Sequence, residues 1–198
     1  APHVEFPLAP FNGAPVALAV GDFDNDLLDD VSIVGNQGVS TFLGDGLGGF
    51  PIGRFMPLDL LTDMQAGFVD GDEFLDLVVT SGRRLDDLGG IEEGYATVLL
   101  GNGDGTFVDA GRFAEGRAVA SVLLGDLKGD APLDALVVVH EVGGGPNGEP
   151  VGRIELWVGD GLGGFAPEGA GDGALATVFE VPNPQGIHPT FGALRDLN

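Results

Sequence analysis

The segment from residue 22 to residue 30 carries the side chains best suited to chemistry. Its carboxylates, Asp22, Asp24, Asp26 and Asp30, stand at the first, third, fifth and ninth positions. Alternate residues of a tight loop can point at one centre, and calcium takes about six to eight oxygen ligands, some of them backbone carbonyls. Without a cation, carboxylates held this close would repel one another and raise their own pKa values. With the carbonyl of Leu28 as a backbone ligand, this loop predicts a calcium site.

An EF-hand is the obvious rival for this spacing. It needs a glutamate at the twelfth position and flanking helices. The twelfth position here is Ile33, inside the apolar run from Val31 to Val34. The segment therefore matches a loop between strands. An aspartate-rich turn that only caps the strand ends is the alternative interpretation.

Three weaker copies of this loop begin at residues 68, 126 and 196. The second copy has Phe68 at its first position, with Glu73 nearby as a substitute ligand. The third has Lys128 at its third position, where an ammonium group could neutralise the carboxylates in place of a metal. The ligands predicted for these copies are Asp70, Asp72 and Asp76; Asp126, Asp130 and Asp134; and Asp196 and Asn198.

A glycine-rich heptapeptide recurs at residues 44–50, 101–107 and 159–165. Each copy follows a short apolar or β-branched run, and its glycines can supply the positive φ angles of a hairpin turn. Each copy ends in phenylalanine. We expect this phenylalanine to begin the next strand and to pack between adjacent sheets.

These elements must be held by a repeated strand unit: strand, acidic loop, strand, variable loop, strand, glycine hairpin, strand. Four strands at a period near 50 residues predict an all-β fold of antiparallel β-propeller blades. We expect one partial propeller domain over residues 1–198, with units at about 6–50, 50–107 and 107–165 and an incomplete unit at 165–198. Residues 4–8 would be a strand of a partial unit, and residues 58–65 could form one helical turn. A single β-sandwich is the alternative, but it would not need the same turn peptide repeatedly.

Composition excludes several classes of function. Against 8 basic residues the chain has 31 acidic ones, a net charge of −23, which would repel phosphate backbones and anionic lipids. We therefore expect no nucleic-acid partner. Cysteine is absent, and every apolar run is too short for a membrane helix, so we expect neither thiolate chemistry nor direct membrane insertion.

Catalytic motifs are scarce. The histidines are His3, His140 and His188, and neither a Gly-x-Ser-x-Gly elbow nor a His-Glu-x-x-His pair occurs. The clustered aspartates already have a metal-loop interpretation. We therefore expect no catalytic residues and no enzyme activity.

The pattern Asp-x-Asp-x-Asp-x-x-x-Asp, followed later by Leu-Gly-Asn-Gly-Asp-Gly-Thr-Phe at residues 100–107, resembles the FG-GAP and VCBS repeats of integrin-α-like β-propellers. The resemblance covers nearly the whole chain. It implies calcium-stabilised blades in secreted or cell-surface proteins, used for adhesion, for ligand recognition or as scaffolds beside catalytic domains. The chain departs from the pattern at Phe68, at Lys128 and at Leu27, where glycine is usual.

Two functions follow as hypotheses. The first is a calcium-stabilised recognition or adhesion module for a protein or glycan, located outside the cell, at its surface or in the periplasm. The second is a structural subunit whose propeller is completed by further chain or by neighbouring subunits in a larger extracellular or membrane-associated assembly. A scaffold within a secreted enzyme is less favoured.

Overall fold

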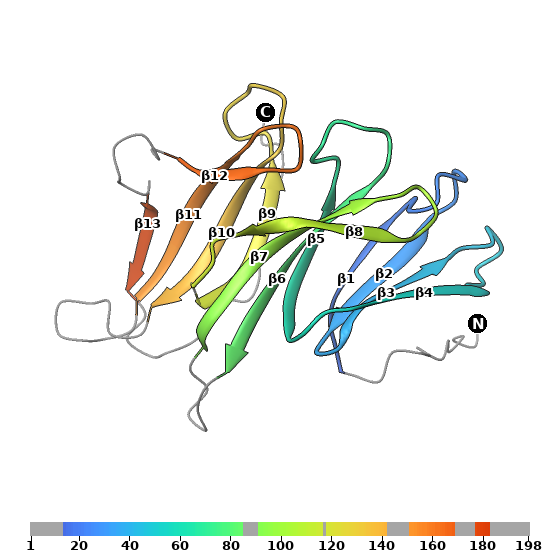
Figure 1. Ribbon diagram of the computed structural model, residues 1–198, viewed down its shortest axis with the longest axis horizontal. Coiled ribbons are helices and arrows are strands. Elements are labelled where there is room, and N and C mark those ends of the chain that lie inside the picture. The colour runs from blue at the N-terminus through green and yellow to red at the C-terminus, as the bar shows by residue number, and fades with distance from the viewer. Residues whose placement is uncertain (1–13, 85–90, 117, 142–150, 169–176, 183–198) are drawn as a thin grey trace.

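The computed structural model describes residues 14–84, 91–116, 118–141, 151–168 and 177–182, and the regular elements in these ranges are all strands (Figure 1). They form three antiparallel sheets that lie side by side. Sheet 1 contains β1 (Pro15–Gly21), β2 (Asp30–Gly35), β3 (Gly38–Leu43) and β4 (Ile52–Pro57). Sheet 2 contains β5 (Leu61–Gly67), β6 (Asp76–Arg84), β7 (Ile91–Gly101) and β8 (Phe107–Phe113). Sheet 3 contains β9 (Ala118–Gly125), β10 (Asp134–Glu141), β11 (Val151–Gly159) and β12 (Phe165–Pro167), and β13 (Thr177–Pro182) pairs with β11.

The predicted all-β fold and the predicted order of strands and loops are confirmed. In each sheet the first and second strands flank an acidic loop, and the third and fourth flank a glycine heptapeptide. Within the described residues the sheets do not close into a ring. The propeller therefore remains a proposal, whereas the repeated four-strand sheet is a finding.

Two details of the predicted organisation differ from the structure. The described sheets begin at residues 15, 61 and 118, whereas the predicted units begin at about 6, 50 and 107. The segment expected to contain a helical turn instead enters strand β5 at Leu61, because Leu61 and Met64 bury their side chains between sheets 1 and 2. The strand predicted at residues 4–8 lies outside the described residues.

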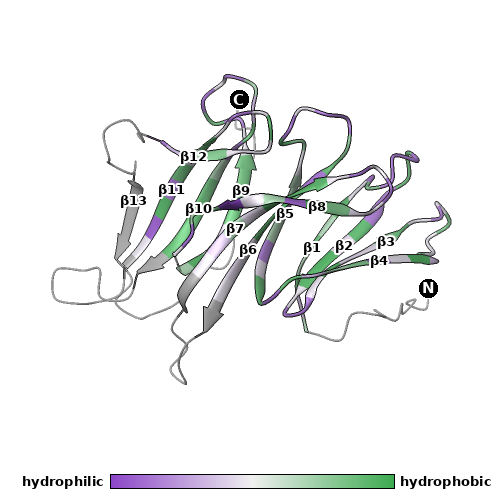
Figure 2. Ribbon diagram, in the orientation of Figure 1, coloured by the Kyte–Doolittle hydropathy of each residue, from purple (hydrophilic) through white to green (hydrophobic). Residues whose placement is uncertain are grey.

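Two apolar clusters fill the spaces between the sheets. Between sheets 1 and 2, Val34 and Val39 meet Met64, Leu77 and other buried side chains of sheet 2. A second cluster joins sheets 2 and 3 in the same way. Figure 2 shows hydrophobic residues along β1, β2, β9, β10 and β11. Each fully buried side chain of this kind contributes about 1.5 to 3 kcal/mol.

The phenylalanines that end the second and third heptapeptides pack between sheets as predicted. Phe107 begins β8 and meets the Phe23 ring edge-on, with ring centroids 5.9 Å apart. Phe165 begins β12 and stacks on Phe113 at 4.8 Å. These aromatic contacts connect the second and third glycine hairpins to the preceding sheets.

Among the described residues there is no helix that could span a membrane.

Candidate metal centre

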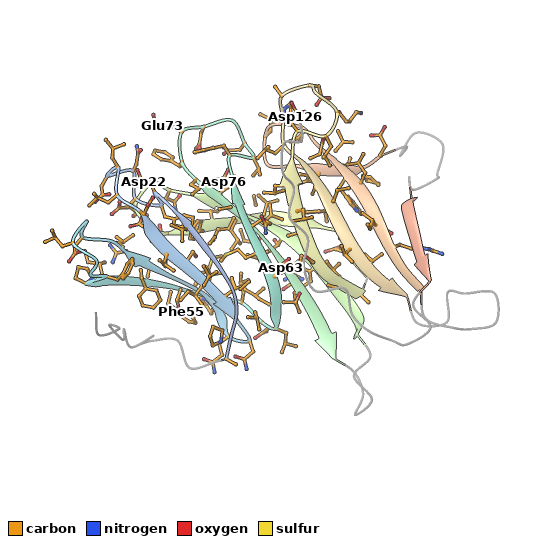
Figure 3. All side chains as sticks on the ribbon, turned by 180° about the vertical axis from the view of Figure 1, so that it is seen from behind. Asp22, Phe55, Asp63, Glu73, Asp76 and Asp126 are labelled. Carbon is orange, nitrogen blue, oxygen red and sulfur yellow. The ribbon has the colours of Figure 1, made fainter. Side chains whose placement is uncertain are left out.

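The three described acidic loops each connect the first two strands of a sheet. Figure 3 shows Asp22, Asp76 and Asp126 along one edge of the molecule, with Asp63 set away from that edge. The repeat thus places one acidic loop from every sheet at the same end of the strands.

In the first loop, carboxylate oxygens of Asp22, Asp24 and Asp26 all lie within 4.8 Å of one another. The Asp22 carboxylate accepts hydrogen bonds from the backbone N–H groups of Asp26 (3.1 Å) and Leu27 (2.8 Å), which curls the loop around it. Asn25 sits in the left-handed region at φ 59°. Gly71 and Gly129 occupy the same position of the other two loops at φ 78° and 73°. Asparagine and glycine adopt this backbone most readily, so the loop bends equally in each repeat.

Asp24 is the residue whose surroundings point most directly to a cation. Its Oδ1 atom is buried and has no hydrogen-bond partner in the described part of the chain. Burial raises the pKa of this carboxyl, and the charges of Asp30, Asp26 and Asp22 raise it further. A buried anionic oxygen without a partner is costly. A hard cation would satisfy it, so the residues of this loop fit a calcium ion.

Asp30 has a role that sequence reasoning missed. It is fully buried, and its two oxygens accept hydrogen bonds from the N–H groups of Phe23 (2.8 Å) and Gly44 (2.7 Å). It thereby joins the start of the acidic loop to the start of the glycine hairpin. Asp30 lies outside the group of three converging carboxylates in this loop. Its assignment as a metal ligand therefore stays a prediction, as does that of the Leu28 carbonyl.

The same bridge recurs in the other sheets. Asp76 accepts from Val69 (2.8 Å) and Gly101 (2.9 Å). Asp134 accepts from Leu127 (3.0 Å) and from Gly159 (3.2 Å). The signal for this role was present in the sequence, because every ninth-position aspartate is paired with a glycine that opens a heptapeptide.

In the second loop, Asp70, Asp72 and Asp76 bring carboxylate oxygens within 4.8 Å of one another. Burial raises the pKa of Asp76, and its hydrogen bonds from Gly101 and Val69 partly offset that effect. Phe68 offers no ligand and is 54% exposed, and Glu73 is exposed and lies outside the group. This loop therefore supplies three carboxylates without the substitute predicted at Glu73.

In the third loop, Asp126, Asp130 and Asp134 converge within the same distance of 4.8 Å. The ammonium of Lys128 forms its ion pair with Glu168, at 3.2 Å. This contact raises the pKa of Lys128, to which Asp130 and Asp134 add a smaller attraction. Glu168 is thus the ion-pair partner of Lys128 in the described part of the chain, and neutralisation of the loop carboxylates by Lys128 stays a prediction.

The acidic loops also bind the glycine hairpin of the following sheet, which sequence reasoning did not foresee. Gly105 donates its N–H to the carbonyl of Phe23 at 2.9 Å, and Gly163 donates to that of Val69 at 3.2 Å. Both glycines have positive φ angles. The first and second acidic loops therefore each hold two hairpins, one from their own sheet and one from the next.

Asp196 and Asn198, the predicted ligands of a fourth loop, lie outside the described residues. No family model matches this chain, and no curated protein matches it.

Proposed function

We propose that this chain is a segment of a calcium-stabilised β-propeller that serves as a recognition or adhesion module for a protein or glycan. The observation that carries the calcium proposal is the buried, unpartnered Oδ1 of Asp24 beside Asp22 and Asp26. The donors are all carboxylate oxygens, which favour a hard cation over zinc or copper.

The propeller proposal is supported by the repeated packing of the sheets. The first strands of neighbouring sheets contact each other, β1 with β5 and β5 with β9. This is the arrangement expected of inner strands around a common axis. This support for a propeller is independent of the loop motifs.

We place ligand recognition on the inserted segments after Gly82 and Gly143, which differ between repeats in length and sequence; Arg83 and Arg84 of the first segment still belong to strand β6. Most of the two segments lies outside the described residues. Calcium sites of extracellular modules bind with dissociation constants of about 10⁻⁴ to 10⁻³ M. An affinity in that range would require a calcium-rich compartment, so we propose a secreted, cell-surface or periplasmic location.

The recognition role is tested by probing arrays of glycans and of extracellular matrix proteins with the chain, in calcium and in chelator. The proposal expects saturable binding in calcium that falls when calcium is removed. A chain that responds to calcium in its melting temperature but shows no saturable binding on either array would contradict the recognition role.

A second function, a structural subunit of a larger assembly, is favoured by a different observation. One face of sheet 1 presents Leu18, Val20 and Phe55 to solvent, with exposed fractions of 65%, 56% and 40%. Exposed apolar faces of this kind mark interaction sites.

A further inference from the structure

The sheet 1 outer face carries five partly exposed apolar side chains, those of Leu18, Val20, Val31, Ile33 and Phe55, with the buried Ser40 and Phe42 between them. Leu18 pairs with Ile33, and Val20 pairs with Val31, so these four side chains lie on one side of the sheet. Ile33 is the register partner of Ser40 on β3, and Ser40 is the register partner of Phe55 on β4. The same face of the sheet therefore extends from β2 to β4. Each of the five is at least partly exposed.

The equivalent positions in the other sheets are buried by a preceding sheet. Leu18 and Ile33 are register partners in sheet 1, as are Met64 and Val79 in sheet 2 and Val122 and Val137 in sheet 3. Met64 and Val79 are 2% and 0% exposed and pack against sheet 1. Val122 and Val137 are 0% exposed and pack against sheet 2. The sheet 1 outer face therefore has the pattern of a surface that another sheet of this kind covers.

The chain also carries the complementary surface. The sheet 3 outer face consists of Leu136, Val138, Ile154 and Leu156, which are partly exposed and paired in register across β10 and β11. Val138 occupies the position in sheet 3 that Val34 holds in sheet 1, and Val34 is buried against sheet 2. Each copy of the chain thus presents both halves of the contact that it already forms internally.

Sheet 1 also has an N–H group at the position that forms a backbone hydrogen bond to the preceding sheet in sheets 2 and 3. Gly105 and Gly163 donate to carbonyls of the preceding acidic loops, and Gly48 is their counterpart in sheet 1. A Cβ atom added at Gly48 would meet no other atom within 4 Å. One added at Gly105 would meet Leu43 of the preceding sheet, and one added at Gly163 would meet Leu100. Phe23 and Val69 are the second residues of their acidic loops. In the loop of sheet 3 the second residue is Leu127, so its carbonyl is the corresponding acceptor.

We infer that the sheet 1 outer face binds the sheet 3 outer face of a second copy of this chain, with Gly48 donating to Leu127 across the contact. The contact is heterologous, so it generates a closed ring where the rotation closes and a longer stack where it does not. This inference deepens the structural-subunit role proposed above and rests on it. It does not depend on calcium binding.

Concentration-dependent sedimentation of the chain tests the contact. We expect reversible self-association, which Leu18→Asp weakens at least about tenfold by placing a charge in the apolar interface. Leu18 is 65% exposed, so the variant folds. Leu162→Asp is the matched control, because Leu162 is 78% exposed even though its hairpin is bound to sheet 2, and Asp104 stands at the same hairpin position. A wild-type chain that stays monomeric at every concentration, or equal weakening by the two variants, overturns the inference.

The direction of the contact is tested with single-cysteine variants, since the chain has no cysteine of its own. A bismaleimide should join Leu18→Cys to Val138→Cys in a mixture of the two variants and should leave each variant alone largely uncrosslinked. Efficient crosslinking of Leu18→Cys to itself would show a face-to-face dimer and would overturn the head-to-tail contact.

The calcium proposal is checked separately on the same protein. Leu18 lies outside the acidic loops, so Leu18→Asp should keep the rise in melting temperature that calcium gives to the wild type. Loss of association with an intact calcium response supports the contact. An absent calcium response in both proteins contradicts the calcium proposal and leaves the association result to decide the contact.

Discussion

At the scale of single residues, Asp24 is what distinguishes the proposed metal loop from an ordinary acidic turn. A turn of surface aspartates would leave its carboxylates hydrated or hydrogen-bonded to backbone N–H groups, as Asp45 is to Leu47 (2.8 Å) and Gly49 (2.7 Å). Those hydrogen bonds lower the pKa of Asp45, whereas burial raises that of Asp24. Aspartates of one chain thus have pKa values shifted in opposite directions by their surroundings.

Asp24→Ala should therefore have opposite consequences with and without calcium. In calcium, the variant should lose most of the stabilisation that ion binding confers on the folded state. In chelator it should melt no lower than the wild type, because the change removes a carboxylate that has one buried, unpartnered oxygen and lies beside acidic neighbours. Thermal denaturation in both buffers measures the two effects.

Asp160→Ala is the control for that experiment. Asp160 accepts from Leu162 (2.8 Å) and Gly164 (2.9 Å) within a glycine hairpin. Its loss should lower the melting temperature by a similar, smaller amount in both buffers. If the two variants respond alike to calcium, Asp24 has no special place in the site.

The pH dependence of metal-free stability follows from the same residues. The folded state raises the pKa values of Asp24 and Asp76, so it binds more protons than the unfolded state just above pH 3.8. The free energy of unfolding should therefore fall as pH rises through this window. Asp45 and Asp104, whose pKa values are lowered, act in the opposite sense and cost stability as pH falls further. Urea unfolding in chelator from about pH 4 to about pH 7 measures this, and a flatter profile for Asp24→Asn assigns it to Asp24.

Leu27 gives a residue-scale prediction that does not involve a metal. It is 88% exposed and held at φ 70°, a backbone region that costs a residue with a Cβ atom about 1 to 2 kcal/mol. Leu27→Gly should stabilise the chain by about 0.5 to 1 kcal/mol after the greater unfolded-state entropy of glycine is counted. Leu47→Gly is the control, because Leu47 is 92% exposed but is not among the positive-φ residues. Equal effects of both changes on urea unfolding would contradict this explanation.

At the scale of elements, the ninth-position aspartates join each acidic loop to the glycine hairpin of its own sheet. Asp76→Ala would leave the buried N–H group of Val69 and the partly buried one of Gly101 without their acceptor. We expect a loss of about 2 to 4 kcal/mol in chelator, measured by urea unfolding. Asp72→Ala, at an exposed position of the same loop, should cost far less in chelator. A comparable loss in both variants would mean that Asp76 has no bridging role.

Much of this element-scale organisation could be predicted from the sequence. Strand order and hairpins follow from apolar runs separated by glycines, and the three groups of converging aspartates follow from their places at the odd-numbered positions of each loop. The partner of Lys128 could not be predicted, because Glu168 lies 40 residues away and meets it only through the pairing of sheet 3. The start of β5 at Leu61 could not be predicted for a similar reason, because the burial of Leu61 depends on packing against sheet 1 rather than on the local sequence pattern.

At the scale of the whole molecule, two equivalent apolar interfaces between sheets stabilise the fold, and the acidic charge opposes them. The net charge of −23 disfavours the compact state through self-repulsion. Cations bound in the acidic loops would relieve that repulsion where it is greatest. Repetition of the interfaces also leaves an apolar face at each end of the row of sheets, and the association that we infer between copies rests on these two faces.

The most direct test of the calcium proposal is the melting temperature of the chain as calcium is added after treatment with chelator. We predict a saturable rise with a midpoint near 10⁻⁴ to 10⁻³ M, about the range of extracellular calcium modules. The rise should be largely lost in Asp24→Ala and retained in Asp160→Ala. Equal melting temperatures in calcium and in chelator would contradict the proposal that these loops bind calcium.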